Sequence, residues 1–205
     1  MKSAAHIELH YLPCQAFLSA MMQYKVQLEL QETYQKRSFR NKCIIASAQG
    51  LTMLTVPLKA GKHQQRAIKE VEISYAEDWR RQHLRTIHTC YRSAPYYAHY
   101  IDSWEKLLKQ EFHYLVDLNL AALRLLCSQL GIPAAFEPTT IYAEEVELDL
   151  RDRINPRTYT GFPQSPYQQV FAQEQAFAPN LSALDLLFCT GPEARTHLSG
   201  LDAYL

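Results

Sequence analysis

The chain has 205 residues, of which 47% are hydrophobic and 20% are charged, a composition typical of a globular protein with a sizeable core. Its 21 basic and 21 acidic residues balance, so net charge gives no reason to expect a nucleic-acid-binding or membrane-surface protein. No apolar run is long enough for a signal peptide or a membrane span. We therefore expect one cytoplasmic domain, 1–205, without a membrane span.

The first part of the chain, 1–75, is rich in strand-like patterns. Apolar and polar residues alternate over 7–11 and again over 26–31, which predicts two strands. Between them, apolar residues at helical spacing predict a helix over 14–24. This order predicts a βαβ unit, in which a right-handed crossover would join two parallel strands.

Shorter strand patterns follow this unit. The segments 43–47 and 51–58 flank an Ala-Gln-Gly turn and predict a hairpin. A further short strand is predicted over 68–73. These strands make a mixed sheet the expectation for the N-terminal half.

The middle of the chain, 76–131, has helical periodicity. We expect helices over 77–92, 95–109 and 112–130, and Gly131 is a suitable C-terminal stop. The predicted fold class is therefore α/β, with α+β as the alternative.

The last part, 132–205, is rich in loops before it returns to helices. VELDL within it is a strand candidate, and the loop 152–166 is long enough to be functional or disordered. Ser182 followed three residues later by Asp185 resembles a capping box at the start of a helix that Gly191 would end.

The segment YQKRSFRNK, residues 34–42, concentrates positive charge in a neutral chain. It contains Lys36, Arg37, Arg40 and Lys42. Arginine grips carboxylate or phosphate with two parallel hydrogen bonds, and Asn41 adds a neutral donor, so the segment is a candidate anion site. If it were extended, Arg40 would share one side with both lysines, and a charged edge strand is the alternative explanation.

Alternate residues of the first predicted strand, His6, Glu8 and His10, would share one face. Such a face could bind a metal ion, but no third and fourth ligand is evident, so a solvated strand face is the alternative and no metal is assigned. His10 also stands between a strand and a helix, where open α/β sheets place ligands, and could act as an acid or base.

Other motifs have ordinary explanations. His83 and His88 are five residues apart, which does not match a helical metal-binding pair, and the neighbouring arginines fit a solvated helix face. The tyrosines near Pro95 fit a core or an interface better than a sugar platform. The five cysteines lie in apolar surroundings and predict reduced, buried thiols, with Cys14 as a catalytic alternative.

Several catalytic motifs are absent from the sequence. It contains no GxGxxG, no GK[ST] and no GxSxG, which argues against P-loop, standard dinucleotide-binding and common serine-hydrolase chemistry. No cofactor is indicated.

Several segments, in order across most of the chain, resemble the bacterial WbqC-like family. They are HYLP (10–13), YQKRSFRNK (34–42), LTVPLK (54–59), WRRQHLRTI with YRSAPYY (79–97), and PNLSALDLLFCTGPE (179–193). The sequence departs from the family pattern near the first motif, where Glu8-Leu9-His10 and Cys14 replace the usual residues. Glu29 and Glu32 stand for its paired aspartates.

The resemblance implies a role in surface-polysaccharide (O-antigen-like) biosynthesis, with acyl or aminoacyl (glycine) transfer to a sugar. The hypothesis is a transferase that binds a small-molecule anionic donor, in which His10 or His83 serves as acid or base and Glu32 orients the basic groups. Substrate binding would involve Lys36, Arg37, Arg40, Asn41, Tyr11 and Asp185. The alternatives are a non-catalytic binding or assembly protein and a nucleotidyltransferase-like enzyme, although the HxGH motif of the latter is missing. The sequence does not decide whether the protein forms a homo-oligomer.

Overall fold

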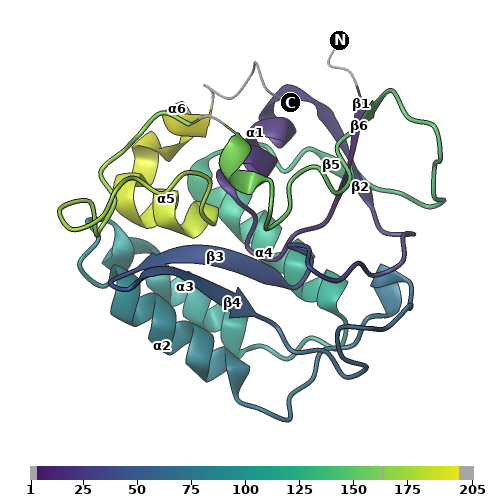
Figure 1. Ribbon diagram of the computed structural model, residues 1–205, viewed down its shortest axis with the longest axis horizontal. Helices are drawn as coiled ribbons and strands as arrows, with labels where there is room; N and C mark the ends of the chain where they lie inside the picture. Colours follow the sequence, from purple (N-terminus) through teal and green to yellow (C-terminus); the bar gives the residue numbers. More distant parts are fainter. Residues whose placement is uncertain (1–3, 163, 199–205) are drawn as a thin grey trace.

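The computed structural model describes residues 4–162 and 164–198 (Figure 1). Residues 1–3 and 199–205 of the expected single domain lie outside the described residues, as does residue 163 of the expected loop 152–166.

A four-stranded parallel sheet contains both ends of the predicted βαβ unit. Strand β1 (Ala4–Glu8), helix α1 (Gln15–Gln23) and strand β2 (Lys25–Glu29) form that unit, and β1 and β2 pair in parallel. Strands β5 (Phe136–Pro138) and β6 (Leu148–Asp149) join its two edges, also in parallel, to give the order β5-β2-β1-β6. The sequence predictions for the unit are confirmed, except that β1 ends at Glu8 while the buried, alternating side chains continue to Tyr11.

The predicted hairpin is also confirmed, as an antiparallel pair of β3 (Lys42–Ser47) and β4 (Gly50–Thr55). The predicted strand over 68–73 is wrong, because Ile68–Glu70 forms the 3-10 turn η1. Ile68 and Val71 are both buried, and their spacing of three residues matches the period of a 3-10 turn. Ile73 pairs with Leu58 in an isolated bridge and not in a strand.

Three helices form the middle of the chain, as predicted. They are α2 (Trp79–Tyr91), α3 (Tyr97–Lys109) and α4 (Leu115–Leu130). Gly131 follows α4 in the left-handed conformation, with φ 63°, and its N–H caps the helix. The tyrosines that cluster near Pro95 belong to the core, since Tyr91, Tyr97 and Tyr100 are buried.

The C-terminal part contains the short turn η2 (Tyr159–Gly161), helix α5 (Ala183–Thr190), turn η3 (Gly191–Glu193) and helix α6 (Ala194–Leu198). The predicted capping box is wrong in its second half. The Ser182 hydroxyl accepts from the N–H of Leu184, but the Ser182 N–H donates to the backbone of Ile44, and Asp185 bonds elsewhere.

The elements pack into one α/β arrangement, which confirms the predicted class (Figure 1). Helices α2 and α3 lie together below the β3–β4 hairpin, and α5 lies on its other side, at the opposite end of the molecule from the parallel sheet. Helix α5 is buried along its length, because it is apolar on nearly every face and contacts α1, α3, α4 and β3. Within the described parts of the chain, no helix combines the length and apolar character needed to cross a membrane.

Candidate functional site

The carboxyl ends of the parallel strands carry a group of charged side chains. Strand β1 lies between β2 and β6, so the chain extends the sheet from β1 in both directions. In open α/β sheets such a switch point, just beyond the strand ends, is where ligands bind. Glu8 and Glu29 are the last residues of β1 and β2, and Arg151 and Asp152 follow β6 closely.

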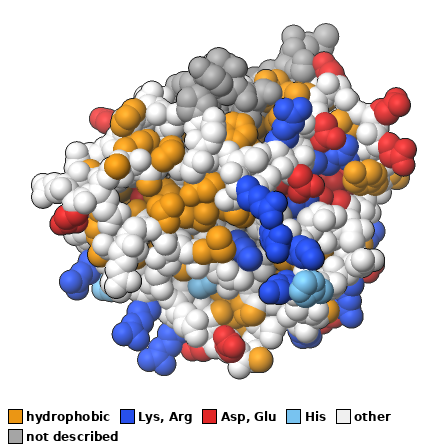
Figure 2. Space-filling model, in the orientation of Figure 1, with side chains coloured by type: hydrophobic (Ala, Val, Ile, Leu, Met, Phe, Trp, Pro, Cys, Tyr) orange, Lys and Arg blue, Asp and Glu red, His pale blue; other side chains and the backbone are white. Residues whose placement is uncertain are grey.

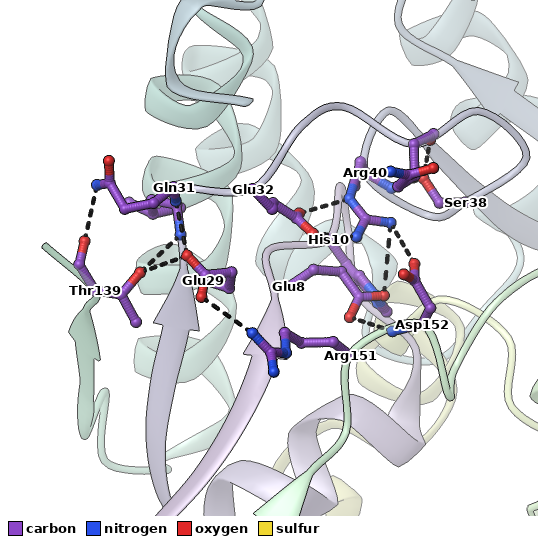
Figure 3. Close-up of polar contacts among 12 residues, drawn as sticks. Glu8, His10, Glu29, Gln31, Glu32, Ser38, Arg40, Thr139, Arg151 and Asp152 are labelled. Atoms are coloured by element: carbon purple, nitrogen blue, oxygen red, sulfur yellow. Dashed lines mark hydrogen bonds and ion pairs between the residues drawn. The ribbon is translucent and has the colours of Figure 1, made fainter. Parts of the chain in front are cut away.

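Arg40 is the centre of this group and is fully buried (Figure 3). Its Nε and Nη2 donate to the two carboxylate oxygens of Glu32 over 2.6 and 2.5 Å, and its Nη1 donates to Asp152 Oδ1 over 2.8 Å. A buried guanidinium requires such partners, because an unpaired charge in the interior is costly. The positive charge of Arg40 therefore meets carboxylates of the chain itself.

Glu8 extends the network on the other side. It accepts a hydrogen bond from the backbone N–H of Asp152 over 2.9 Å, and its Oε1 lies 2.8 Å from His10 Nε2 and 3.9 Å from Arg40 Nη1. Burial alone would raise the pKa of Glu8, but the interactions with His10 and Arg40 outweigh burial and lower it. Asp152 reaches both partners from a left-handed backbone conformation, with φ 57°.

Glu32 has the opposite electrostatic balance. Burial raises its pKa to about 7 in spite of the two hydrogen bonds from Arg40, and the charges of Glu8 and Asp152 raise it further. A carboxyl group that titrates near neutral pH at the edge of a hollow is suited to accept or donate a proton.

The basic segment 34–42 forms a turn instead of a strand, with Arg37 at φ 61°. The predicted extended segment, with Arg40 and both lysines on one side, and the alternative of a charged edge strand are therefore both wrong. While Arg40 points inward, Lys36, Arg37 and Lys42 line a hollow of about 530 Å³.

We call this the basic hollow. Lys62 and His63 also line it, and its remaining lining residues are Tyr34, Asn41, Thr55, Val56, Pro57, Leu58 and Gly61. None of its lining residues is acidic, and its lysines and its arginine have no ion-pair partner among the described residues. Figure 2 shows Lys and Arg side chains gathered beside a histidine on this face. Asn41 is held in the wall by the Tyr34 hydroxyl and by its own bond to the Val56 carbonyl.

A second hollow, of about 290 Å³, lies over the strand ends; we call it the polar hollow. Its lining residues are Gln31, Glu32, Thr33, Gln35, Tyr142, Arg151 and Asp152. Because Tyr34 and Lys36 face the basic hollow, the short segment 32–36 separates the two.

His10 is enclosed. Its ring packs against Phe17 and Phe39, with centroids 4.9 and 5.6 Å away, and none of the described residues forms a hydrogen bond with Nδ1. The face predicted for His6, Glu8 and His10 exists only as the Glu8–His10 pair; across the described ranges no three His, Cys, Asp or Glu residues gather as metal ligands.

His83 and Tyr11 form a separate buried pair. The Tyr11 hydroxyl lies 3.0 Å from His83 Nδ1, and His83 Nε2 lies 3.2 Å from the Thr55 carbonyl oxygen. Since a carbonyl only accepts, Nε2 carries the proton and Nδ1 accepts from the tyrosine. Burial lowers the pKa of His83 to about 4, so the ring is neutral at pH 7.

Asp185 lies in a third buried group. Its carboxylate accepts hydrogen bonds from the hydroxyls of Tyr91 (2.8 Å) and Tyr167 (2.5 Å) and from the Gln169 amide (3.2 Å). Burial raises the pKa of Asp185 against the effect of these bonds. The structure therefore brings His10, Glu32 and Arg40 into one network and places His83 and Asp185 in two others.

The five cysteines are all free and buried, as predicted. Burial raises the pKa of the Cys14 thiol to about 11, which disfavours the nucleophilic thiolate at neutral pH.

A model of the WbqC-like protein family matches residues 9–160. The chain belongs to the WbqC-like protein family. It is also 26% identical over 234 aligned residues to the uncharacterized protein Rv1507c of Mycobacterium tuberculosis (strain ATCC 25618 / H37Rv), covering 97% of this chain and 98% of that protein. No solved structure matches the chain.

The family match covers both hollows of this WbqC-like chain and nearly all of the Arg40 network, and it ends before α5 and Asp185. Sequence reasoning missed Arg151, Asp152, Lys62 and His63, which come from segments that are distant from 34–42 along the chain. The Lys-His pair in the turn KAGKHQQ was the one available signal, because a turn after a hairpin returns to the end where the hairpin began.

Proposed function

We propose that this protein is a cytoplasmic transferase of bacterial surface-polysaccharide (O-antigen-like) biosynthesis. It would move an acyl or aminoacyl group, such as glycine, from an activated anionic donor to a sugar. The resemblance described above suggests the biosynthetic setting. The basic hollow is the observation that carries the proposal, since it offers three lysines and an arginine and no carboxylate.

The shape of the basic hollow suits a donor that carries phosphate. Cations approach from two turns, 35–38 and 59–62, each with a residue in the left-handed conformation: Arg37 at φ 61° and Gly61 at φ 68°. Pro57 and Leu58 supply an apolar wall beside them. A volume of about 530 Å³ lies within the range of small-molecule sites, so a phosphate group and an attached organic part both fit.

The network behind the hollow gives the remaining residues their proposed roles. Arg40 fixes Glu32 and Asp152, so it positions acidic groups and does not grip the donor. Glu32 is the acid or base, because it faces a hollow while His10 and His83 are enclosed. His10 positions Glu8, and the Tyr11–His83 pair holds β4 against α2.

Isothermal titration with nucleotide sugars, acyl-coenzyme A and aminoacyl donors tests the proposal. We expect one donor class to bind, with about thirtyfold lower affinity for the double variant Lys36→Ala/Lys42→Ala, since each of the two charge-assisted contacts contributes about 1 kcal/mol. Binding should also weaken as salt is added. Lys106→Ala, an exposed lysine of α3, is the matched control and should leave the affinity unchanged. Equal binding by wild type and the double variant would contradict the assignment.

A non-catalytic binding protein is the second candidate. The specific observation in its favour is that Arg40, Glu8 and Glu32 already satisfy one another, as in a structural ion-pair network. This candidate predicts a protein partner in pull-down experiments and no ligand in a thermal-shift screen. A metabolite that binds with low-micromolar affinity would argue against it.

A further inference from the structure

The polar hollow differs from the basic hollow in charge and in place. It lies past the carboxyl ends of β2 and β6, where the parallel sheet has its switch point. Its volume of about 290 Å³ is at the lower end of small-molecule sites. A ligand of monosaccharide size is therefore the largest that it would enclose.

The charged groups of the polar hollow are already paired with one another. Arg151 donates from Nε and Nη2 to the two carboxylate oxygens of Asp149, each over 2.8 Å. Its Nη1 lies 3.5 Å from Glu29 (Figure 3). Glu32 and Asp152 share Arg40. An anion entering here would meet the carboxylates of Glu32 and Asp152 and a cation would meet the guanidinium of Arg151, so the hollow favours a ligand without net charge.

The groups that remain open to a ligand are suited to hydroxyls. Carboxylate oxygens of Glu32 and Asp152 only accept hydrogen bonds, whereas Thr33 and Gln35, both exposed, can donate as well as accept. A hydroxyl group does both, so a ring of hydroxyls can satisfy acceptors and donors at once. Tyr142, half exposed at the rim, adds an aromatic ring against which the C–H face of a sugar can pack, and the Arg151 guanidinium fixes that ring at 4.7 Å.

We propose that the polar hollow is a binding site for a hydroxyl-rich, uncharged ligand of monosaccharide size, held by Glu32, Gln35 and Tyr142. This inference rests on the proposed function, because it assigns the polar hollow to the sugar acceptor of the proposed transfer. Donor and acceptor would then lie on opposite flanks of the segment 32–36.

Titration of the 15N-labelled full chain tests this site directly. The probes are the methyl glycosides of glucose, galactose and mannose, added up to about 50 mM because small neutral ligands bind in the millimolar range. We expect saturable amide shifts at Thr33, Gln35 and Tyr142 with at least one probe. A glucuronide should bind more weakly than the matching neutral glycoside.

Variants separate this site from the basic hollow. Tyr142→Ala and Gln35→Ala, both at exposed positions, should each weaken glycoside binding several-fold, while Lys62→Ala should leave it unchanged. The inference is overturned if no glycoside gives saturable shifts, if the shifts map to 36–42 and 55–63, or if neither variant weakens binding. Donor titration of the same samples reports the basic hollow separately, so either site can fail while the other stands.

Discussion

At the scale of single residues, neighbours in one basic segment have opposite surroundings. Arg40 is fully buried and bonded to Glu32 and Asp152, whereas Arg37, three positions earlier, is exposed at the basic hollow. A charge in the interior depends on its partners, and a charge at the surface is solvated by water. The two arginines therefore allow a matched comparison.

We expect Arg40→Ala to lower the free energy of unfolding by about 3–5 kcal/mol, because it leaves Glu8 and Glu32 buried without their cation. Arg37→Ala should change it by less than about 0.5 kcal/mol, as for most exposed positions. Urea unfolding monitored by circular dichroism gives both values. If Arg40→Ala lowered the free energy of unfolding by no more than the small change expected for Arg37→Ala, the network would not stabilise the fold.

The sequence identified this segment but not the fate of each side chain. It predicted that Lys36, Arg37, Arg40, Asn41 and Glu32 belong together. Lys36, Arg37 and Asn41 line the basic hollow and Glu32 lines the polar hollow, whereas Arg40 is buried and lines neither. The sequence could not separate Arg40 from its neighbours, because only one of its two hydrogen-bonded carboxylates, Glu32, is nearby, and the other, Asp152, lies 112 positions further along the chain. Local patterns carry no information about such contacts.

At the scale of elements, local patterns predicted the long periodic segments and the short strand β6, which lies within VELDL, but they predicted neither β5 nor the pairing of these two short strands. The βαβ unit, the hairpin and the three middle helices follow from local periodicity and from stops such as Gly131. Strands β5 and β6 have three and two residues, and their parallel pairing with β2 and β1 depends on contacts across more than 100 positions. The turn at 68–70 was mistaken for a strand because three residues are too few to distinguish the two periods.

The end of α4 gives a prediction at this scale. Gly131→Ala should lower the free energy of unfolding by about 1 kcal/mol, since a Cβ in the left-handed conformation is strained although no atom obstructs it. Gly161→Ala is the control, because Gly161 also has open space but not that conformation, and it should be close to neutral. Thermal unfolding of both variants measures the difference, and equal effects would contradict a strained cap.

At the scale of the whole molecule, the response to acid should depend on His83. The pKa of His83 in the native state, about 4, lies below its ordinary value of 6.5, so between these pH values the unfolded chain binds a proton on His83 that the native state does not bind. The resulting stability is complete above pH 6.5 and is lost as the pH falls towards 4, by about 3 kcal/mol. Glu32 acts in the opposite direction, because its raised pKa of about 7 favours the native state as the pH falls from 7.

Comparison with His83→Asn isolates this effect, since Glu32 is common to both proteins and an amide can still accept from Tyr11. The stability advantage of the wild type should shrink by about 3 kcal/mol between pH 7 and pH 4 in urea titrations. An advantage that stays constant over this range would mean that His83 is not buried as a neutral ring.

The segment 32–36 contributes side chains to both hollows. Tyr34 and Lys36 line the basic hollow, and Glu32, Thr33 and Gln35 line the polar hollow. A ligand bound in one hollow would therefore restrict the backbone torsions that position the side chains of the other. Any influence of one occupant on the affinity of the other is equal in both directions, as thermodynamic linkage requires. If both proposed ligands bind, these five consecutive residues would couple the two sites without the movement of a domain.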